Sequence, residues 1–173
     1  GWIYYFGKCI PCDIDKAIHY LSLAASNKSD ALYMLGYIYD TDKGSHHDIK
    51  KAIHYYTLAA AQNNSNALYN LGIVYFQGTG VPHDINKAIY YFTLAADQNH
   101  PDAQYDLGIW YIKNGKSPNE IKKGIEYLSL SAKQNNSKAQ FWLGQAYYFG
   151  VAVKKDIAKG IYLFIQSADN HFI

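Results

Sequence analysis

The chain has 173 residues, of which 49% are hydrophobic, 16% aromatic and 17% charged. This composition excludes a disordered chain, and the length is that of one ordinary domain. The formal net charge is +2, and all 16 basic residues are lysine. Because grooves that bind phosphate ordinarily use bidentate arginine side chains, we expect no nucleic acid partner.

The sequence contains no run of about 20 apolar residues, so we expect no membrane insertion. We recognise no signal peptide, and the sequence assigns no compartment. The chain opens with Gly1 and not with methionine. Either it is processed or it was cut from a longer chain, and we expect its repeats to be a fragment of a longer array.

One period of 35 or 36 residues runs through the sequence. It is carried by a glycine after leucine, a lysine and an alanine, at Gly36, Gly72, Gly108 and Gly144, at Lys16, Lys51, Lys87, Lys123 and Lys159, and at Ala31, Ala67, Ala103 and Ala139. Such self-similarity indicates a stack of repeats. The predicted units are a partial one at 1–30, then 31–66, 67–102, 103–138 and 139–173.

Each unit is predicted to hold two helices. In the third unit, apolar residues at helical spacing place the first helix at about 66–77 and the second at about 85–98, with a glycine- and proline-rich turn between them. We expect the glycine inside the first helix to allow close helix packing. A face that one unit cannot bury alone must be covered by its neighbours. The prediction is an all-α, right-handed α-α superhelical solenoid of about five two-helix repeats.

Capping residues mark the expected helix starts in chain order. Each predicted second helix follows an acidic residue, at Asp13, Asp48, Asp84, Glu120 and Asp156. Short acidic side chains cap the free N–H groups, so Glu120 is predicted to be the weakest of these caps. Each predicted first helix follows Lys28, Asn64, His100 or Asn136.

The motif of the third unit runs from Ala67 through Leu71-Gly72, Tyr75, Gly78-x-Gly80, Asp84 and Lys87-Ala88 to Ala95-Ala96. It resembles the Sel-1-like repeat, a relative of the tetratricopeptide repeat, and the resemblance covers nearly the whole chain. The second unit departs from it in its loop, and the fourth has Gly124 in place of the alanine. The resemblance implies a non-enzymatic adaptor that needs no cofactor and binds other proteins or peptides.

In the related tetratricopeptide fold the first helices line a concave face. Carried onto this sequence, that face is a stripe at positions i, i+4 and i+7 of each first helix, which we call the first-helix stripe. Its members are Tyr33, Tyr37, Asp40, Tyr69, Ile73, Phe76, Tyr105, Ile109, Ile112, Phe141, Gln145 and Tyr148. We predict that an apolar peptide or protein binds there. The column of Tyr33, Tyr69, Tyr105 and Phe141 fits equally well as core between repeats with only an exposed edge. The tyrosine column at Tyr39, Tyr75, Tyr111 and Tyr147 is predicted to be core.

The sequence contains few motifs that indicate catalysis or metal binding. Cys9 and Cys12 form a Cys-x-x-Cys pair, which is open to three readings: structural thiols or a loop disulfide, a metal site, or a redox dithiol. No second pair completes a zinc site, so no metal is predicted. The histidines, including His46 and His47, are expected to be exposed to solvent.

Two further expectations concern the surface. Asn27, Asn63 and Asn135 each begin an Asn-x-Ser sequon in the turn between repeats, and one copied ancestral turn explains all three better than glycosylation does. Apolar residues at both ends of the chain indicate end-to-end self-association or coverage by a missing neighbour. The alternatives to a protein-binding scaffold are a helical-repeat RNA binder and a thiol- or metal-dependent enzyme that uses Cys9 and Cys12.

Overall fold

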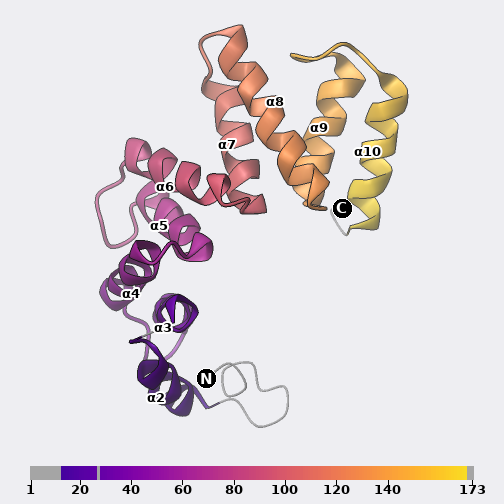
Figure 1. The fold of residues 1–173 in the computed structure, drawn as a ribbon. Helices are drawn as coiled ribbons and strands as arrows, with labels where there is room; N and C mark the ends of the chain where they lie inside the picture. The colour runs from indigo at the N-terminus through magenta and orange to yellow at the C-terminus, as the bar shows by residue number, and fades with distance from the viewer. Residues whose placement is uncertain (1–12, 27, 171–173) are drawn as a thin grey trace. The chain divides into compact units, whose positions relative to one another are not determined.

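The computed structural model describes residues 13–26 and 28–170, and it shows helices and no strand in these residues (Figure 1). The helices are α2 (Ile14–Ala24), α3 (Ser29–Thr41), α4 (Ile49–Ala61), α5 (Ser65–Gln77), α6 (Ile85–Asp97), α7 (Pro101–Asn114), α8 (Pro118–Lys133), α9 (Ser137–Phe149) and α10 (Ile157–Asp169). The prediction of an all-α helical-repeat solenoid is confirmed.

The chain divides into two compact units, Gly1–Tyr91 and Phe92–Ile173, and the boundary falls inside α6. In the first unit α3 packs against α2 and α4, and α4 packs against α5. In the second unit α8 packs against α7 and α9, and α9 packs against α10. These helices therefore bury their apolar faces against their neighbours in the chain, as stacked repeats must.

The core of each unit is a row of small clusters. In the first unit, one cluster joins α2 to α3, and the next joins α3, α4 and α5 around the fully buried ring of Tyr56. In the second unit, a cluster of buried side chains joins α8, α9 and α10, and it includes Leu128, Leu143 and Leu163. Each of these clusters joins helices of successive repeats, so the described core is spread along the stack.

Side-chain caps begin most helices, as the sequence predicted. The four aspartates each accept a hydrogen bond of 3.0 or 3.1 Å from the backbone N–H three residues on, in the pairs Asp13–Lys16, Asp48–Lys51, Asp84–Lys87 and Asp156–Lys159. The first helices use Asn64, His100 and Asn136 in the same way, while Lys28 makes no side-chain cap bond. These bonds satisfy N–H groups that a helix end leaves without a partner.

The second helix of the fourth repeat starts differently from the prediction. Glu120 is not the cap, because Ser117 occupies that position and Pro118 is the first helical residue. Ser117 Oγ accepts from the N–H of Glu120 at 3.3 Å, and Glu120 Oε2 accepts from the N–H of Ser117 at 3.1 Å. This reciprocal pair satisfies two N–H groups at once, so α8 begins early and reaches 16 residues.

Glycine allows the helix pairs of the second unit to approach closely. A Cβ atom at Gly108 would lie 2.8 Å from Leu128 Cγ and 3.0 Å from the carbonyl oxygen of Gly124. A Cβ at Gly144 would lie 3.1 Å from the carbonyl oxygen of Gly160. Gly124 and Gly160 stand where the second helices of earlier repeats have alanine, so α7–α8 and α9–α10 each meet glycine to glycine.

Asparagine holds a left-handed backbone in the turn between repeats. The φ angles of Asn63, Asn99 and Asn135 are 59°, 61° and 62°. Asparagine tolerates this conformation better than other non-glycine residues do. Asn99 begins no sequon, yet it has the same backbone, so the conformation of the turn explains the recurring asparagine.

Buried polar side chains tie the helices of the second unit together. Ser131, which is fully buried, donates a hydrogen bond of 2.7 Å to the carbonyl oxygen of Pro101. Gln104 is only 1% exposed, and its Oε1 accepts from Gln134 at 2.8 Å. The first bond joins α8 to α7, and the second joins Gln134, the C-cap residue of α8, to α7. Hydrogen bonds therefore specify this interface together with apolar contacts.

Candidate partner-binding face

In the first unit, the first-helix stripe lies on α3 and α5. All its members there are half-buried except Phe76, which is 50% exposed. The ring of Tyr33 lies 6.1 Å from the rings of both Tyr37 and Tyr56. The hydroxyl of Tyr56 donates a hydrogen bond of 3.0 Å to Asp40 Oδ2. The single acidic member of the stripe is therefore held by a buried tyrosine.

Tyr33 serves the core as well as the surface. It packs against both apolar clusters of the first unit, the one between α2 and α3 and the one around Tyr56. Burial of the ring raises the pKa of the Tyr33 hydroxyl. The same cause raises the pKa of Tyr56, which the sequence analysis did not single out. Both side chains stay neutral at physiological pH, and Tyr33 presents only part of its ring to solvent.

In the second unit, the stripe lies on α7 and α9. Tyr105, Ile109 and Ile112 are half-buried and pack against the cluster that joins α8, α9 and α10. Burial raises the pKa of the Tyr105 hydroxyl. Tyr148 is 36% exposed, and its ring lies 6.1 Å from that of Phe164. In the second unit the stripe therefore consists of half-buried apolar side chains and of aromatic rings that are partly exposed to solvent.

A second repeated feature pairs tyrosines under the lysine column. The rings of Tyr39, Tyr75 and Tyr111 lie 5.7, 5.6 and 6.0 Å from those of Tyr55, Tyr91 and Tyr127, and each pair is stacked. Lys51, Lys87 and Lys123 lie over the first ring of each pair at 5.1, 5.0 and 4.8 Å. The predicted core column is half-buried, and in Tyr39, Tyr75 and Tyr111 each ring packs against a partner tyrosine and a lysine.

This feature explains why the lysine recurs. Lys51 and Lys87 also form ion pairs with the capping carboxylates of Asp48 and Asp84, at 3.7 and 3.9 Å. The backbone N–H of Asp84 in turn donates to the carbonyl oxygen of Tyr75 at 3.0 Å. In the second and third repeats, tyrosine, cap and lysine therefore close the inter-helix loop together.

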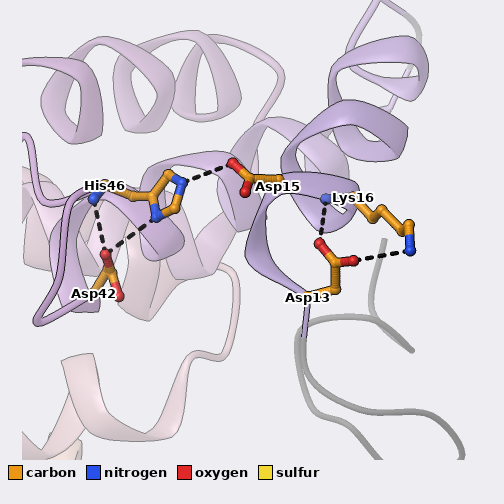
Figure 2. A network of polar contacts seen from close by, with 5 residues as sticks. All are labelled: Asp13, Asp15, Lys16, Asp42 and His46. Carbon is orange, nitrogen blue, oxygen red and sulfur yellow. Dashed lines mark hydrogen bonds and ion pairs between the residues drawn. The ribbon is translucent and has the colours of Figure 1, made fainter.

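His46 lies between two carboxylates (Figure 2). Its side chain is only 25% exposed, so the expectation of a solvent-exposed histidine is wrong at this position. Its Nε2 is 3.0 Å from Asp15 Oδ1 on α2, and its Nδ1 is 3.4 Å from Asp42 Oδ2 at the end of α3. The backbone N–H of His46 also donates to Asp42 at 2.9 Å, which lowers the pKa of that carboxyl. These contacts tie the inter-helix loop of the second repeat to α2, the helix before α3.

The described residues hold no candidate catalytic pair of the kind that the sequence offered at Cys9 and Cys12. Cys9 and Cys12 lie outside the described residues. Among the residues that are described, no three His, Cys, Asp or Glu side chains gather in a way that could hold a metal ion. No helix in the described ranges is long and apolar enough to cross a membrane.

Solved structures resemble this chain over nearly its full length. The crystal structure of a Sel1 repeat protein from Oxalobacter formigenes matches 99% of the chain and 70% of its own, with a TM-score of 0.90 and 27% identity. The crystal structure of c5321, a protective antigen present in uropathogenic Escherichia coli strains that displays an SLR fold, matches at a TM-score of 0.88 and 32% identity. That match covers 96% of this chain but 36% of the antigen. A search of curated proteins gave no match.

The Sel1 repeat family model matches five consecutive segments, residues 1–29, 29–64, 65–100, 101–136 and 137–172. The last four segments start at or next to the first residues of α3, α5, α7 and α9, so each holds one helix pair. The units expected from the sequence start two residues later, inside the first helix. Proteins of this family generally mediate protein–protein interactions and are generally not enzymes. Five family segments and the helix-pair architecture together show that the chain belongs to the Sel1 repeat family.

Proposed function

We propose that this chain is a protein-binding scaffold whose partner docks on the first-helix stripe. The observation that carries the proposal is the recurrence of the stripe at the same positions of α3, α5, α7 and α9, with Asp40 as its only charged member. In the first unit it exposes half of Phe76, and in the second unit it exposes Tyr148. A partner can bury these rings with little loss of conformational entropy, because the neighbouring half-buried residues already hold them in place.

The chemistry of the stripe defines the kind of partner. Asp40 already accepts a hydrogen bond from Tyr56, and the remaining members are tyrosine, phenylalanine, isoleucine and glutamine. Within either unit, such a surface suits an extended or helical peptide with apolar or aromatic anchors spaced to meet its successive first helices. Charge steering contributes little there, so binding should depend only weakly on salt.

Site-specific photo-crosslinking tests the proposal. A photoreactive phenylalanine at Phe76 or at Tyr148 should crosslink the partner when the protein is expressed in its native setting. Tyr90 is the matched control, because it is 60% exposed but lies on the second helix α6. Labelling at Tyr90 and not at the two stripe positions would overturn the assignment.

The identified partner then allows a quantitative test. Replacing Phe76 and Tyr148 together by alanine should weaken its binding by at least about tenfold, because central aromatic contacts each contribute about 1–2 kcal/mol or more. The helical circular dichroism spectrum should be unchanged, since both rings are substantially exposed. Unchanged affinity in this double variant would place the partner elsewhere.

We also propose that α10 mediates self-association with a second copy of the chain. Its Ile157, Ile161 and Ile165 follow one another at every fourth position and are 47%, 47% and 56% exposed. Ile125, one period before Ile161, is only 5% exposed because the following repeat covers it. Sedimentation across a wide concentration range should therefore show association that Ile161→Lys abolishes, whereas a monomer at every concentration would refute this proposal.

A further inference from the structure

We propose that the second unit carries a separate docking site, a lysine-lined groove that binds an acidic peptide segment with apolar anchors. Its lining residues come from α8, from the connection between α9 and α10, and from Tyr147 and Lys159 on those two helices. It shares no residue with the first-helix stripe, so a segment bound there would leave the stripe free.

Two adjoining hollows make up the groove. One has a volume of about 550 Å³ and is bordered by Lys154, Lys155 and Lys159. The other has a volume of about 410 Å³ and is bordered by Lys122 and Lys133 of α8. Tyr147 and Val153 line both hollows. The two hollows therefore adjoin at Tyr147 and Val153, and we treat them together as the groove.

The charge of the groove selects an acidic occupant. Its ionisable lining comprises five lysines and two acidic residues, Glu126 and Asp156. Asp156 is already engaged as the N-cap of α10, where it accepts from the N–H of Lys159 at 3.0 Å. The lining is thus markedly more positive than the chain as a whole, whose net charge is only +2. Carboxylates of a bound peptide would offset this concentration of charge.

The floor of the groove is apolar. Tyr147 and Val153 are half-buried and pack against the core cluster of the second unit. Leu130 is 43% exposed on the α8 side. A peptide that places an apolar side chain on this floor would bury it together with Leu130 and Val153. A nucleic acid would leave these contacts unmade, and a chain without arginine lacks the side chain best suited to phosphate.

The last repeat differs from the earlier ones in a way that opens this site. In the second, third and fourth repeats the equivalent tyrosine is stacked on another tyrosine. In the fifth repeat the stacking position is Leu163, which is buried, so no tyrosine stacks on Tyr147 from that position, and Tyr147 lines both hollows. Lys159 lies over the Tyr147 ring at 3.9 Å, which places a cation at the floor of the groove.

Fluorescence anisotropy with a defined probe tests the proposal on the full chain. The probe is a labelled peptide in which Leu-Phe-Leu lies between two acidic triplets. It should bind at low salt, and raising the salt should weaken it. The variant K154E/K155E should lose about tenfold or more in affinity, because two attractive contacts become repulsive. The control variant K43E/K50E makes the same change in net charge on exposed lysines of the first unit and should bind as the unmodified chain does.

Two further measurements separate this site from a general attraction for anions. Replacing Leu-Phe-Leu of the probe by three serines, or Leu130 of the protein by serine, should each weaken binding several-fold at either salt concentration. Equal binding of the serine probe, equal loss in the control variant, or binding of an oligouridylate as tightly as the peptide would each overturn the proposal. Circular dichroism verifies folding, and K154Q/K155Q, which should show a smaller loss, replaces the charge reversal if that variant unfolds.

Discussion

The imidazole Nδ1 of His100 accepts a hydrogen bond of 3.3 Å from the backbone N–H of Ala103 and so caps α7. This bond requires a neutral Nδ1. Burial lowers the pKa of His100, and the nearby carboxylate of Asp102 opposes that shift only in part. In the preceding and the following repeats, Asn64 and Asn136 perform the same capping without a titrating group.

The first prediction is a pH dependence of stability that originates at His100. Its pKa is lower in the folded than in the unfolded chain, so the unfolded chain binds more protons below about pH 6.5. Stability should therefore be complete above that pH and fall as the pH decreases toward the folded pKa. His100→Asn keeps a capping oxygen and should flatten the curve of unfolding free energy between about pH 7 and 5, measured by denaturant titration. An identical slope in both proteins would show that His100 does not titrate in this range.

The second prediction concerns the glycine contact between α7 and α8. Gly108→Ala would place a Cβ 2.8 Å from Leu128 Cγ and 3.0 Å from a backbone carbonyl oxygen. We expect the variant to lose about 1–3 kcal/mol of unfolding free energy, although alanine favours helix over glycine by about 1 kcal/mol. Gly108→Leu should lose more. Thermal melts measure both, and a higher Tm for Gly108→Ala would mean that the two helices separate at little cost.

The third prediction concerns backbone strain at Ala152. Its φ is 57°, whereas the equivalent position two repeats earlier is Gly80, with a φ of 73°. A β-branched side chain suffers most in this conformation, so Ala152→Val should cost about 1–2 kcal/mol. Ala152→Gly should be neutral or raise the Tm slightly, because relief of strain offsets the greater freedom of the unfolded chain. Equal stability of the valine variant would show that the loop relaxes to another conformation.

The fourth prediction separates two buried or half-buried serines of α8. Ser131 donates to the carbonyl oxygen of Pro101 on α7, whereas Ser129 donates to Ile125 in its own helix. Ser131→Ala removes a bond between helices and leaves the carbonyl of Pro101 without this donor, so it should cost about 1–2 kcal/mol. Ser129→Ala should be close to neutral, since alanine favours the helix. Denaturant unfolding of the two variants side by side tests whether the polar ties between helices stabilise the stack.

The repeat, the helix pairs and most caps could be predicted because each depends on residues close together in the sequence. The capping box of α8 is equally local, because Ser117 and Glu120 are three positions apart. The prediction named Glu120 as the cap because Glu120 occupies the column of the capping aspartates. The sequence shows that lysine recurs once in each repeat. It does not show the physical reason, because the loop brings Lys87 back over Tyr75 only in the folded chain.

Other features depend on contacts between repeats. His46 meets Asp15, which lies 31 positions earlier, and nothing in the local sequence marks that pairing. Tyr33 is half-buried because clusters on both sides of α3 enclose it, so its helical position alone left its exposure open. The lysine-lined groove could not be predicted, because its lysines come from α8, from the loop after α9 and from α10, and the two sets lie more than 20 positions apart in the sequence.

The ties between helices also have a consequence for how the chain folds and how it responds to damage. The side-chain bonds of Tyr56, Ser131, His46 and Asn136 reach partners 16, 30, 31 and 34 positions away. Such short sequence separations give a low contact order, so a repeat can form against its neighbour without waiting for distant segments to meet. A lesion in one repeat should then destabilise mainly the adjacent repeats, and amide hydrogen exchange should show a loss of protection that decays with distance from the lesion.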